Sequence, residues 1–100
     1  MEAELSRGVE IVRTLSDCLL AIGHPARFKI VEYCDKPRRF TEIVLNLKLN
    51  PASFKFHSGV LIDCNLIEKV ERGVYRRTVL GNLLLDLVEN AVRLSAKNCD

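Results

Sequence analysis

Residues 50–78 of this 100-residue chain, NPASFKFHSGVLIDCNLIEKVERGVYRRT, predict a helix followed by a tight hairpin. Asn50 is a favourable N-cap, and Pro51 suits the first helical position because its missing N–H would have no intrahelical partner there. Asn65 can end the helix in a left-handed conformation. The residues that share one side of this predicted reader helix, residues 51–64, are Phe54, Val60, Leu61 and Cys64.

The hairpin follows the reader helix directly. Residues 67–71 (IEKVE) and 74–77 (VYRR) predict two strands joined around Arg72 and Gly73. A helix followed by a basic hairpin can place one element in a DNA groove and the other on the adjacent backbone. This stretch is therefore the strongest functional signal of the chain.

The length and charge of the chain are consistent with one small nucleic-acid-binding domain. One hundred residues with 48% hydrophobic content form a single domain with a modest core. The formal net charge of +2 is unevenly distributed: −2 over residues 1–24, +5 over residues 25–78 and −1 over residues 79–100. Positive charge gathered around the predicted reader helix is typical of phosphate contact, while a merely solvated basic face is the alternative.

No membrane or secretion signal is expected. The first ten residues, MEAELSRGVE, are acidic and polar, unlike a signal peptide. No apolar run approaches the roughly 18 residues that a membrane span needs. We expect a soluble, cytoplasmic protein with no membrane partner, and no small-molecule ligand is evident.

The cysteines do not form a metal-binding pattern. Cys18, Cys34, Cys64 and Cys99 are far apart, without a CxxC pair, so we expect neither a metal nor another cofactor. The first three stand among apolar residues of predicted helices. Small buried thiols are the simpler interpretation, and a redox sensor is the alternative.

Four further helices and a short strand complete the prediction. A first helix over residues 7–22 ends at Gly23, and Pro25 starts a second over residues 26–34. Residues 38–40 predict a short strand, and Thr41 caps a third helix over residues 42–47. The Lys48–Asn50 turn then gives a helix-turn-helix, and the last helix spans residues 79–97.

The terminal helices carry apolar residues on two faces. The exterior helix of a small domain needs only one, so the second face indicates burial against another copy, although a thick monomer core is the alternative. We predict one domain, residues 1–100, whose residues 5–22 and 79–97 are dimerisation helices. The candidate interface residues are Ile11, Leu15, Leu84, Leu87, Val88, Ala91 and Leu94.

Several short motifs resemble the ArsR-type winged-helix regulators and their archaeal relatives. Residues 21–30 (AIGHPARFKI) are similar to that family's leader, and Phe56-His57, Leu61 and residues 65–67 (NLI) to its reader helix and first wing strand. Residues 75–78 (YRRT), followed by Leu80-Gly81, resemble the segment after the wing. The resemblance covers roughly residues 15–90. It implies a mainly α winged helix-turn-helix, in the order α-α-(short β)-α-α-β-β-α, that binds DNA.

The chain departs from that family at two places. Ser58 stands where the family usually has a core Leu, and Gly59 follows inside the helix, which costs about 1 kcal/mol relative to Ala. We expect either a kink or unusually close packing there. Residues 42–47 (EIVLNL) replace the paired cysteines of metal-sensing members, and the last helix has no His/Asp cluster. The resemblance thus implies DNA binding without metal sensing.

The exposed first half of the reader helix is predicted to read DNA. It contains no Arg, Asn or Gln for a bidentate base contact, so discrimination should be modest or shared with DNA shape. Packing against a neighbouring helix is the alternative role of Phe56, and His57 is interpreted as a hydrogen-bonded packing residue. The predicted reader residues are Pro51, Ala52, Ser53, Lys55 and Phe56. The predicted wing and backbone contacts are Arg72, Arg76, Arg77, Arg38, Arg39, Thr41 and Lys48.

These observations favour a homodimeric, sequence-specific regulator of transcription that binds double-stranded DNA, of archaeal or bacterial type. A winged-helix protein-interaction module and a low-specificity, chromatin-like DNA-binding protein are the alternatives. An enzyme is not expected, because His24 and His57 lie on separate elements and no catalytic arrangement follows from the spacing.

Overall fold

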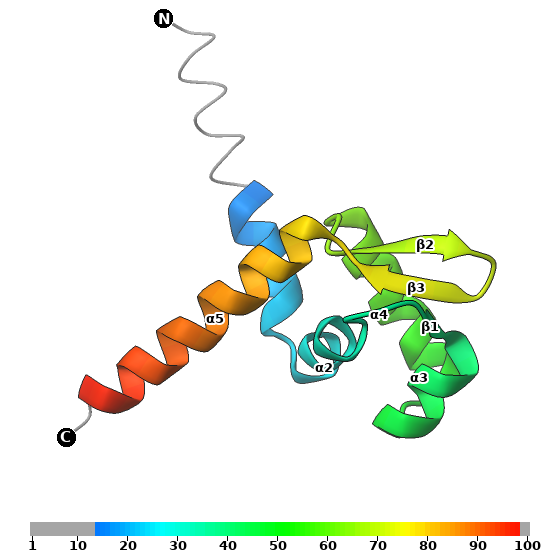
Figure 1. Ribbon diagram of the computed structural model, residues 1–100, viewed down its shortest axis with the longest axis horizontal. Coiled ribbons are helices and arrows are strands. Elements are labelled where there is room, and N and C mark those ends of the chain that lie inside the picture. The colour runs from blue at the N-terminus through cyan, green and yellow to red at the C-terminus, as the bar shows by residue number, and fades with distance from the viewer. Residues whose placement is uncertain (1–13, 99–100) are drawn as a thin grey trace, which may run out of the picture.

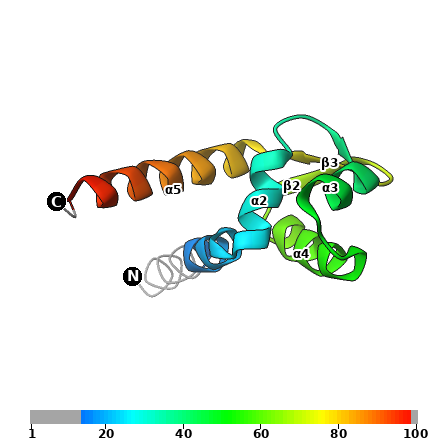
Figure 2. The ribbon, with the colours of Figure 1, turned by 90° about the horizontal axis from the view of Figure 1, so that it is seen from below.

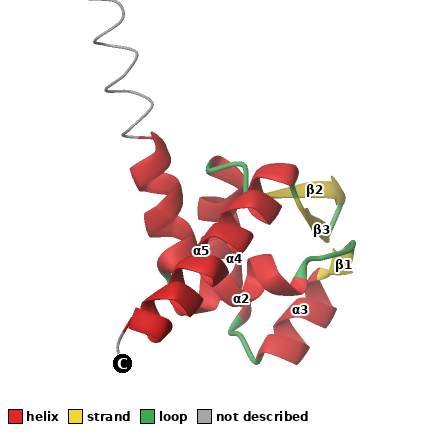
Figure 3. Cartoon of the chain, turned by 60° about the vertical axis from the view of Figure 1, so that its left-hand side comes forward, coloured by secondary structure: helices red, strands yellow, loops and turns green. Residues whose placement is uncertain are grey.

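The computed structural model describes residues 14–98 as a helical body with a small antiparallel sheet at one side (Figures 1 and 3). A helix over residues 14–23 comes first. The elements that follow are α2 (Pro25–Tyr33), β1 (Arg38–Arg39), α3 (Phe40–Leu47), α4 (Pro51–Asp63), β2 (Ile67–Glu71), β3 (Val74–Arg77) and α5 (Val79–Asn98). None of the helices within this part of the chain is long and apolar enough to cross a membrane.

Side-chain caps start two of the helices. The Asn50 Oδ1 accepts a hydrogen bond of 2.8 Å from the Ala52 N–H, which confirms the predicted cap of α4. His24 does the same for α2, where its Nδ1 accepts from the Ala26 N–H at 3.2 Å. A proline follows each cap at the first helical position, so its missing N–H leaves no intrahelical hydrogen bond unmade.

The start of α3 differs from the prediction. Thr41 was expected to cap this helix, which is wrong, because α3 begins at Phe40 with Arg39 at the N-cap position. The Glu42 carboxylate accepts from the Arg39 N–H at 3.3 Å, and the Phe40 N–H donates to the Gly73 carbonyl at 2.8 Å. Pairing with the hairpin and the Glu42 side chain, rather than a threonine hydroxyl, therefore set where the helix begins.

Two other helix ends shift by one residue. The first helix continues through Gly23, and α2 ends at Tyr33 with Cys34 as its C-cap. Among residues 14–98, three adopt the left-handed conformation: Lys48 (φ 55°) after α3, Asn65 (φ 60°) after α4 and Gly73 (φ 75°) in the hairpin turn. The expectation for Asn65 is confirmed.

The sheet has the strand order β1-β3-β2, and all pairs are antiparallel. The two hairpin strands have the predicted bounds, and β1 pairs Arg38 with Tyr75 and Arg39 with Val74. The register of the hairpin shifts between Lys69 and Glu71, as at a β-bulge. The short strand β1 ties the start of α3 to the hairpin.

The core lies between the helix over residues 14–23, α2, α3, α4, the start of α5 and the sheet. Phe54 of α4 is almost fully buried, and its ring meets Phe40 and Tyr75 edge-on, at centroid distances of 5.4 and 5.3 Å. This aromatic contact holds the hairpin against the helix-turn-helix. The buried apolar residues around it are Cys18, Ala21, Ile22, Ile30, Val31, Cys34, Ile43, Leu61, Leu66, Ile67 and Leu84.

Helix α5 joins the body through its first two turns. The Thr78 hydroxyl accepts from the Gly81 N–H at 3.0 Å and donates to the Asn65 carbonyl at 2.6 Å. Gly81 is required there, because a Cβ would lie 2.3 Å from the Leu66 carbonyl oxygen. Leu84 and Leu85 are buried and Val88 packs partly against the core. The C-terminal part of α5 runs away from the rest of the chain in both views (Figures 1 and 2).

Candidate nucleic-acid interface

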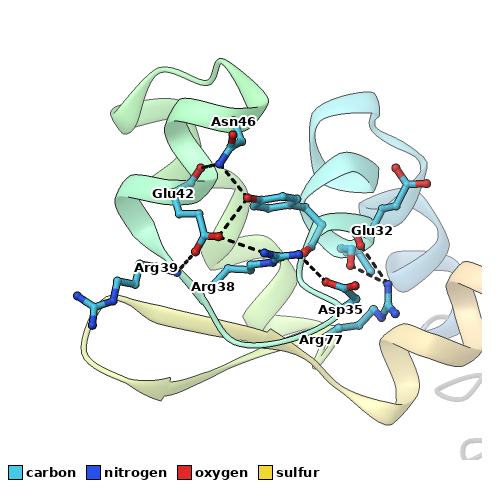
Figure 4. A network of polar contacts seen from close by, with 9 residues as sticks. Glu32, Asp35, Arg38, Arg39, Glu42, Asn46 and Arg77 are labelled. Carbon is cyan, nitrogen blue, oxygen red and sulfur yellow. Dashed lines mark hydrogen bonds and ion pairs between the residues drawn. The ribbon is translucent and has the colours of Figure 1, made fainter.

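The Arg38 side chain makes several polar contacts with α2, α3 and the turn between α2 and β1 (Figure 4). Its guanidinium contacts Asp35 at 3.0 Å and Glu42 at 3.1 Å, and its Nε donates to the Tyr33 carbonyl at 3.0 Å. The same group lies 4.3 Å from the Tyr33 ring centroid, and only 17% of the Arg38 side chain is exposed. Arg38 therefore links β1 to α2 and α3.

The acidic partners of this network are held in their charged form. The hydrogen bond from Arg38 lowers the pKa of Asp35, and the Arg39 backbone N–H, followed by the Arg38 side chain, lowers the pKa of Glu42. The Tyr33 hydroxyl donates to Glu42 at 3.3 Å and accepts from Asn46 at 2.8 Å (Figure 4). The network stabilises the orientation of α3 relative to α2.

Arg77 is also engaged within the fold. Its Nη1 donates to the carbonyls of Val31 and Glu32, at 3.1 and 3.3 Å, and its Nε donates to the Asn82 side chain. The backbone N–H of Arg77 donates to the Cys34 carbonyl at 2.8 Å. Burial raises the pKa of the Cys34 thiol to about 12. Arg77 thus joins the C-terminal end of α2 to β3 and α5.

Arg76 is half exposed and has a cross-strand partner. It faces Glu68 in the sheet register, with its Nη2 2.5 Å and its Nε 3.2 Å from a carboxylate oxygen of that residue. Exposed pairs of this kind are typically worth less than about 1 kcal/mol. A phosphate group can therefore compete for the guanidinium at little cost in stability.

The other predicted backbone contacts are exposed and make no ion pair within residues 14–98. Arg39 and Arg72 come from different segments, yet both line one hollow of ≈ 360 Å³ at the hairpin tip, together with Thr41. Glu71 lines the same hollow. Lys48 is exposed at the turn between α3 and α4. The fold thus brings Arg39, Thr41 and Arg72 together, although Arg39 and Arg72 are 33 positions apart in the sequence.

The predicted reader residues are all exposed on the first two turns of α4. Pro51, Ala52, Ser53 and Lys55 lie on the surface, and Phe56 is 65% exposed. The ring of Phe56 lies 5.5 Å, centroid to centroid, from that of its neighbour His57. The alternative that Phe56 is buried against another helix does not hold within the single chain.

An apolar groove runs between α4 and the hairpin, and sequence reasoning missed it. Gly59 and Ile62 line it from α4, and Lys69 and Tyr75 from the two hairpin strands. Close packing at Gly59 was one of two expectations, and it is wrong, because a Cβ there would meet no atom within 4 Å. The adjacent small residues Ser58 and Gly59 were the available signal of this α4–hairpin groove.

His57 packs against the start of α2. Its ring centroid lies 4.6 Å from that of His24, and its Nδ1 is buried without a hydrogen-bond partner, as is the Arg27 Nε. The expected packing role is therefore observed without a hydrogen bond to Nδ1. Burial, reinforced by the nearby charges of His24 and Arg27, lowers the pKa of His57.

The residues predicted for a dimer interface lie in three environments. Leu84 is buried in the core of the single chain, and Val88 packs partly against that core. Leu15, Leu87, Ala91 and Leu94 are exposed, whereas Ile11 lies outside the described residues. The available apolar surface is therefore the outer face of α5 and of the helix over residues 14–23. Its large members are Leu15, Leu19, Leu20, Val79, Leu83, Leu87, Val92 and Leu94.

The described cysteines are free thiols. Cys18 and Cys34 are buried and Cys64 is partly so, and the Cys18 Sγ donates to the Cys64 carbonyl at 3.6 Å. Burial, followed by the influence of Cys18, raises the pKa of Cys64. Cys99 lies outside the described residues. Residues 14–98 contain no group of three or more side chains able to hold a metal ion.

Comparison with solved structures identifies the architecture. The chain is similar to reduced HlyU from Vibrio cholerae N16961, with a TM-score of 0.68 over 85% of this chain and 95% of that one. The protein has a winged-helix fold. Sequence identity between the two chains is only 16%, so the similarity concerns the fold. No protein-family model matches the sequence, and no curated protein matches it either.

Proposed function

We propose that this winged-helix protein is a homodimeric, sequence-specific regulator of transcription that binds double-stranded DNA. The observation that carries the proposal is that Phe40 lines both the hollow at the hairpin tip and the groove beside the exposed first half of α4. Arg39 and Arg72 share the hollow at the hairpin tip, and Lys55 lies on α4 itself. A helix for the major groove and cations for the flanking phosphates are what such a reader requires.

The internal contacts divide the predicted cations into two groups. Within residues 14–98, Arg39, Lys48, Lys55 and Arg72 make no ion pair, so we assign the phosphate contacts to them first, with Arg76 as an auxiliary contact. Arg38 and Arg77 would have to break hydrogen bonds that hold α2, which makes their contact with DNA unfavourable. Replacing Arg38 or Arg77 should therefore destabilise the fold, whereas replacing Arg39, Lys48, Lys55 or Arg72 should not.

Base discrimination is proposed to be modest. The exposed reader side chains are small, apolar or carry a single ammonium group, as at Ala52, Phe56 and Lys55. Apolar contact with a thymine methyl and a lysine hydrogen bond to guanine are the direct contacts available to them. Deformability of the site would supply the remaining specificity.

Dimerisation is proposed through the outer face of the terminal helices. Leu83, Leu87 and Leu94 leave a long apolar strip of α5 exposed beyond the core. Pairing two chains there would bury it and present two α4 helices to adjacent major grooves, roughly 34 Å apart. The kinship with ArsR-type regulators, the cytoplasmic location and the lack of catalytic activity belong to this same proposal.

Selection of bound fragments from random DNA, followed by gel-shift titration at several salt concentrations, tests the proposal. One enriched, near-palindromic sequence bound more tightly than random DNA, with an affinity that falls as salt rises, is the expected result. Equal affinity for any duplex would indicate a chromatin-like role instead. Absence of binding even at low salt would favour a protein-interaction module.

A further inference from the structure

The α4–hairpin groove extends beyond the proposed DNA contacts, because most of its lining comes from residues outside the predicted reading surface. It has a volume of ≈ 570 Å³, within the roughly 300–1,000 Å³ of small-molecule sites. Its lining includes the aromatic residues Phe40, Phe54 and Tyr75, which belong to the edge-on cluster that joins α3, α4 and β3. The base of the groove is therefore apolar.

The groove exists because two successive residues of α4 are small. Ser58 is buried and turns its hydroxyl back to the Lys55 carbonyl, 3.1 Å away, while Gly59 contributes no side chain at all. A Cβ at Gly59 would enter open space. Glycine in the middle of a helix costs about 1 kcal/mol relative to Ala, so the residue that keeps the groove open also lowers the stability of α4.

The charges around the groove are all of one sign. Lys55 of α4 and Lys69 of β2 both line it and are exposed, and the Lys69 Nζ lies 5.9 Å from the Tyr75 ring centroid. None of the residues that line the groove, which fall between positions 40 and 75, is acidic. An apolar base with two ammonium groups at its sides is complementary to a molecule that is itself apolar with an anionic end.

We propose that the α4–hairpin groove binds a small amphipathic carboxylate. Its hydrocarbon part would lie against Phe40, Phe54 and Tyr75, over the space left by Gly59. Its carboxylate would be held by Lys55 and Lys69. Burial of the hydrocarbon supplies most of the affinity, and the two ammonium groups select an anion over a neutral or cationic molecule of the same shape.

Occupancy of the groove has a consequence that rests on the proposed DNA-binding function. Ala52 and Lys55 line the groove and also belong to the predicted reading surface. A bound carboxylate would occupy Lys55 and place a negative charge beside the phosphates. The ligand and DNA therefore compete, and the ligand releases the protein from DNA.

Titration of the full chain with decanoate, followed by isothermal calorimetry and amide chemical shifts, tests the site without reference to DNA. We expect one saturable site, with shifts centred on α4 and the hairpin, and at least tenfold weaker binding of 1-decanol and of decyltrimethylammonium. Equal binding of the three compounds, or shifts confined to the outer face of α5, would overturn the proposal.

Filling the groove provides the second measurement. Gly59→Leu places a side chain in the open space and improves helix propensity, so the variant should fold with undiminished stability while losing decanoate affinity at least tenfold. Asp63→Leu adds the same side chain to an exposed position of α4, outside the groove lining and the predicted DNA contacts, and should bind decanoate like the parent. Unchanged decanoate binding by a folded Gly59→Leu variant would refute the site.

Competition separates the site from its consequence. With a selected DNA fragment, decanoate at ten times its dissociation constant should weaken apparent DNA affinity about tenfold in the parent and not in Gly59→Leu. Saturable groove binding with unchanged DNA affinity would contradict the competition and leave the site standing. Failure of the chain to bind any DNA would contradict the proposed function and leave the calorimetric result unaffected.

Discussion

Arg77 of β3 donates a hydrogen bond of 3.1 Å to the carbonyl oxygen of Val31, in the last turn of α2. The carbonyls of that turn have no intrahelical donor, and a cation there also interacts favourably with the helix dipole. A residue from the basic hairpin thus supplies a hydrogen-bond donor to the C-terminal end of α2, at a carbonyl 46 positions earlier in the chain. Two adjacent arginines of one strand consequently have different roles.

Replacing Arg77 by Met should lower the free energy of unfolding by about 1.5–3 kcal/mol, because the part-buried Val31 carbonyl loses a charged donor. Arg76→Met removes only an exposed cross-strand pair and should change stability by less than about 1 kcal/mol. Urea denaturation of the two variants compares them directly. Equal losses would show that the contact with α2 is not a stabilising one.

Glycines at positions 81 and 59 should respond in opposite directions to alanine. Gly81→Ala would force a Cβ to within 2.3 Å of the Leu66 carbonyl, so a loss of about 1–3 kcal/mol is expected as α5 shifts. Gly59→Ala meets no atom within 4 Å and should gain up to about 1 kcal/mol of helix propensity. Thermal unfolding measures both. A destabilised Gly59→Ala variant would mean that the groove wall is packed after all.

Stability should fall as the solution is acidified through the range in which histidine titrates. Burial, with His24 and Arg27 nearby, lowers the pKa of His57 in the folded state, so the unfolded chain binds a proton first. The free energy of unfolding therefore decreases as pH falls from about 7.5 through the unfolded histidine value near 6.5.

His57→Gln should flatten this dependence, which denaturation at a series of pH values can measure. The carboxylates of Asp35 and Glu42 do not interfere, since their lowered pKa values place their losses at more acidic pH. A variant with the same pH slope as the parent would show that His57 is not the group responsible.

Cations at the hairpin tip should control salt-dependent DNA binding. Arg39→Ala and Arg72→Ala together should weaken affinity for all duplexes and reduce the slope of log affinity against log salt by about 2, one per phosphate contact. Both residues are exposed, so stability should change by less than about 0.5 kcal/mol. Arg93→Ala, on the exposed part of α5, is the matched control. An unchanged slope would place the phosphates elsewhere.

Charged substitutions on α5 should separate the proposed dimer. Leu87 and Leu94 are 54% and 60% exposed, so glutamate at both positions should leave the monomer folded and prevent association. Sedimentation should then give a single species of 11.3 kDa. Leu45→Glu changes a leucine of α3 that is 76% exposed, outside the proposed interface, and should leave a dimer. A monomeric parent chain would contradict the assembly itself.

Local signals in the sequence predicted most of the elements. Asn50 followed by Pro51, the Asn65 terminator and the Arg72–Gly73 turn act within a few residues of themselves, so both ends of α4 and both hairpin strands were predictable. The start of α3 was not, because the Gly73 carbonyl, 33 residues away, receives the first helical N–H.

The roles of the basic residues were less accessible to sequence reasoning. Arg38 and Arg39 are adjacent and chemically identical, yet the first is enclosed by Tyr33, Asp35 and Glu42 while the second lines an exposed hollow. Alternation along β1 sends the two side chains to opposite faces of the sheet. The side chains that each arginine meets on its face come from elements outside β1, so the sequence of the strand does not predict them.

The sequence by itself determined the order of helices and strands, the caps and turns that bound them and the concentration of positive charge between residues 25 and 78. These depend on backbone preferences and composition, which act over short distances. Only the tertiary structure decided which cations remain free for a phosphate, which leucines of α5 stay outside the core and that Ser58 and Gly59 leave a groove open. Such properties depend on which surfaces the folded chain buries against each other, and burial is a property of the assembled elements.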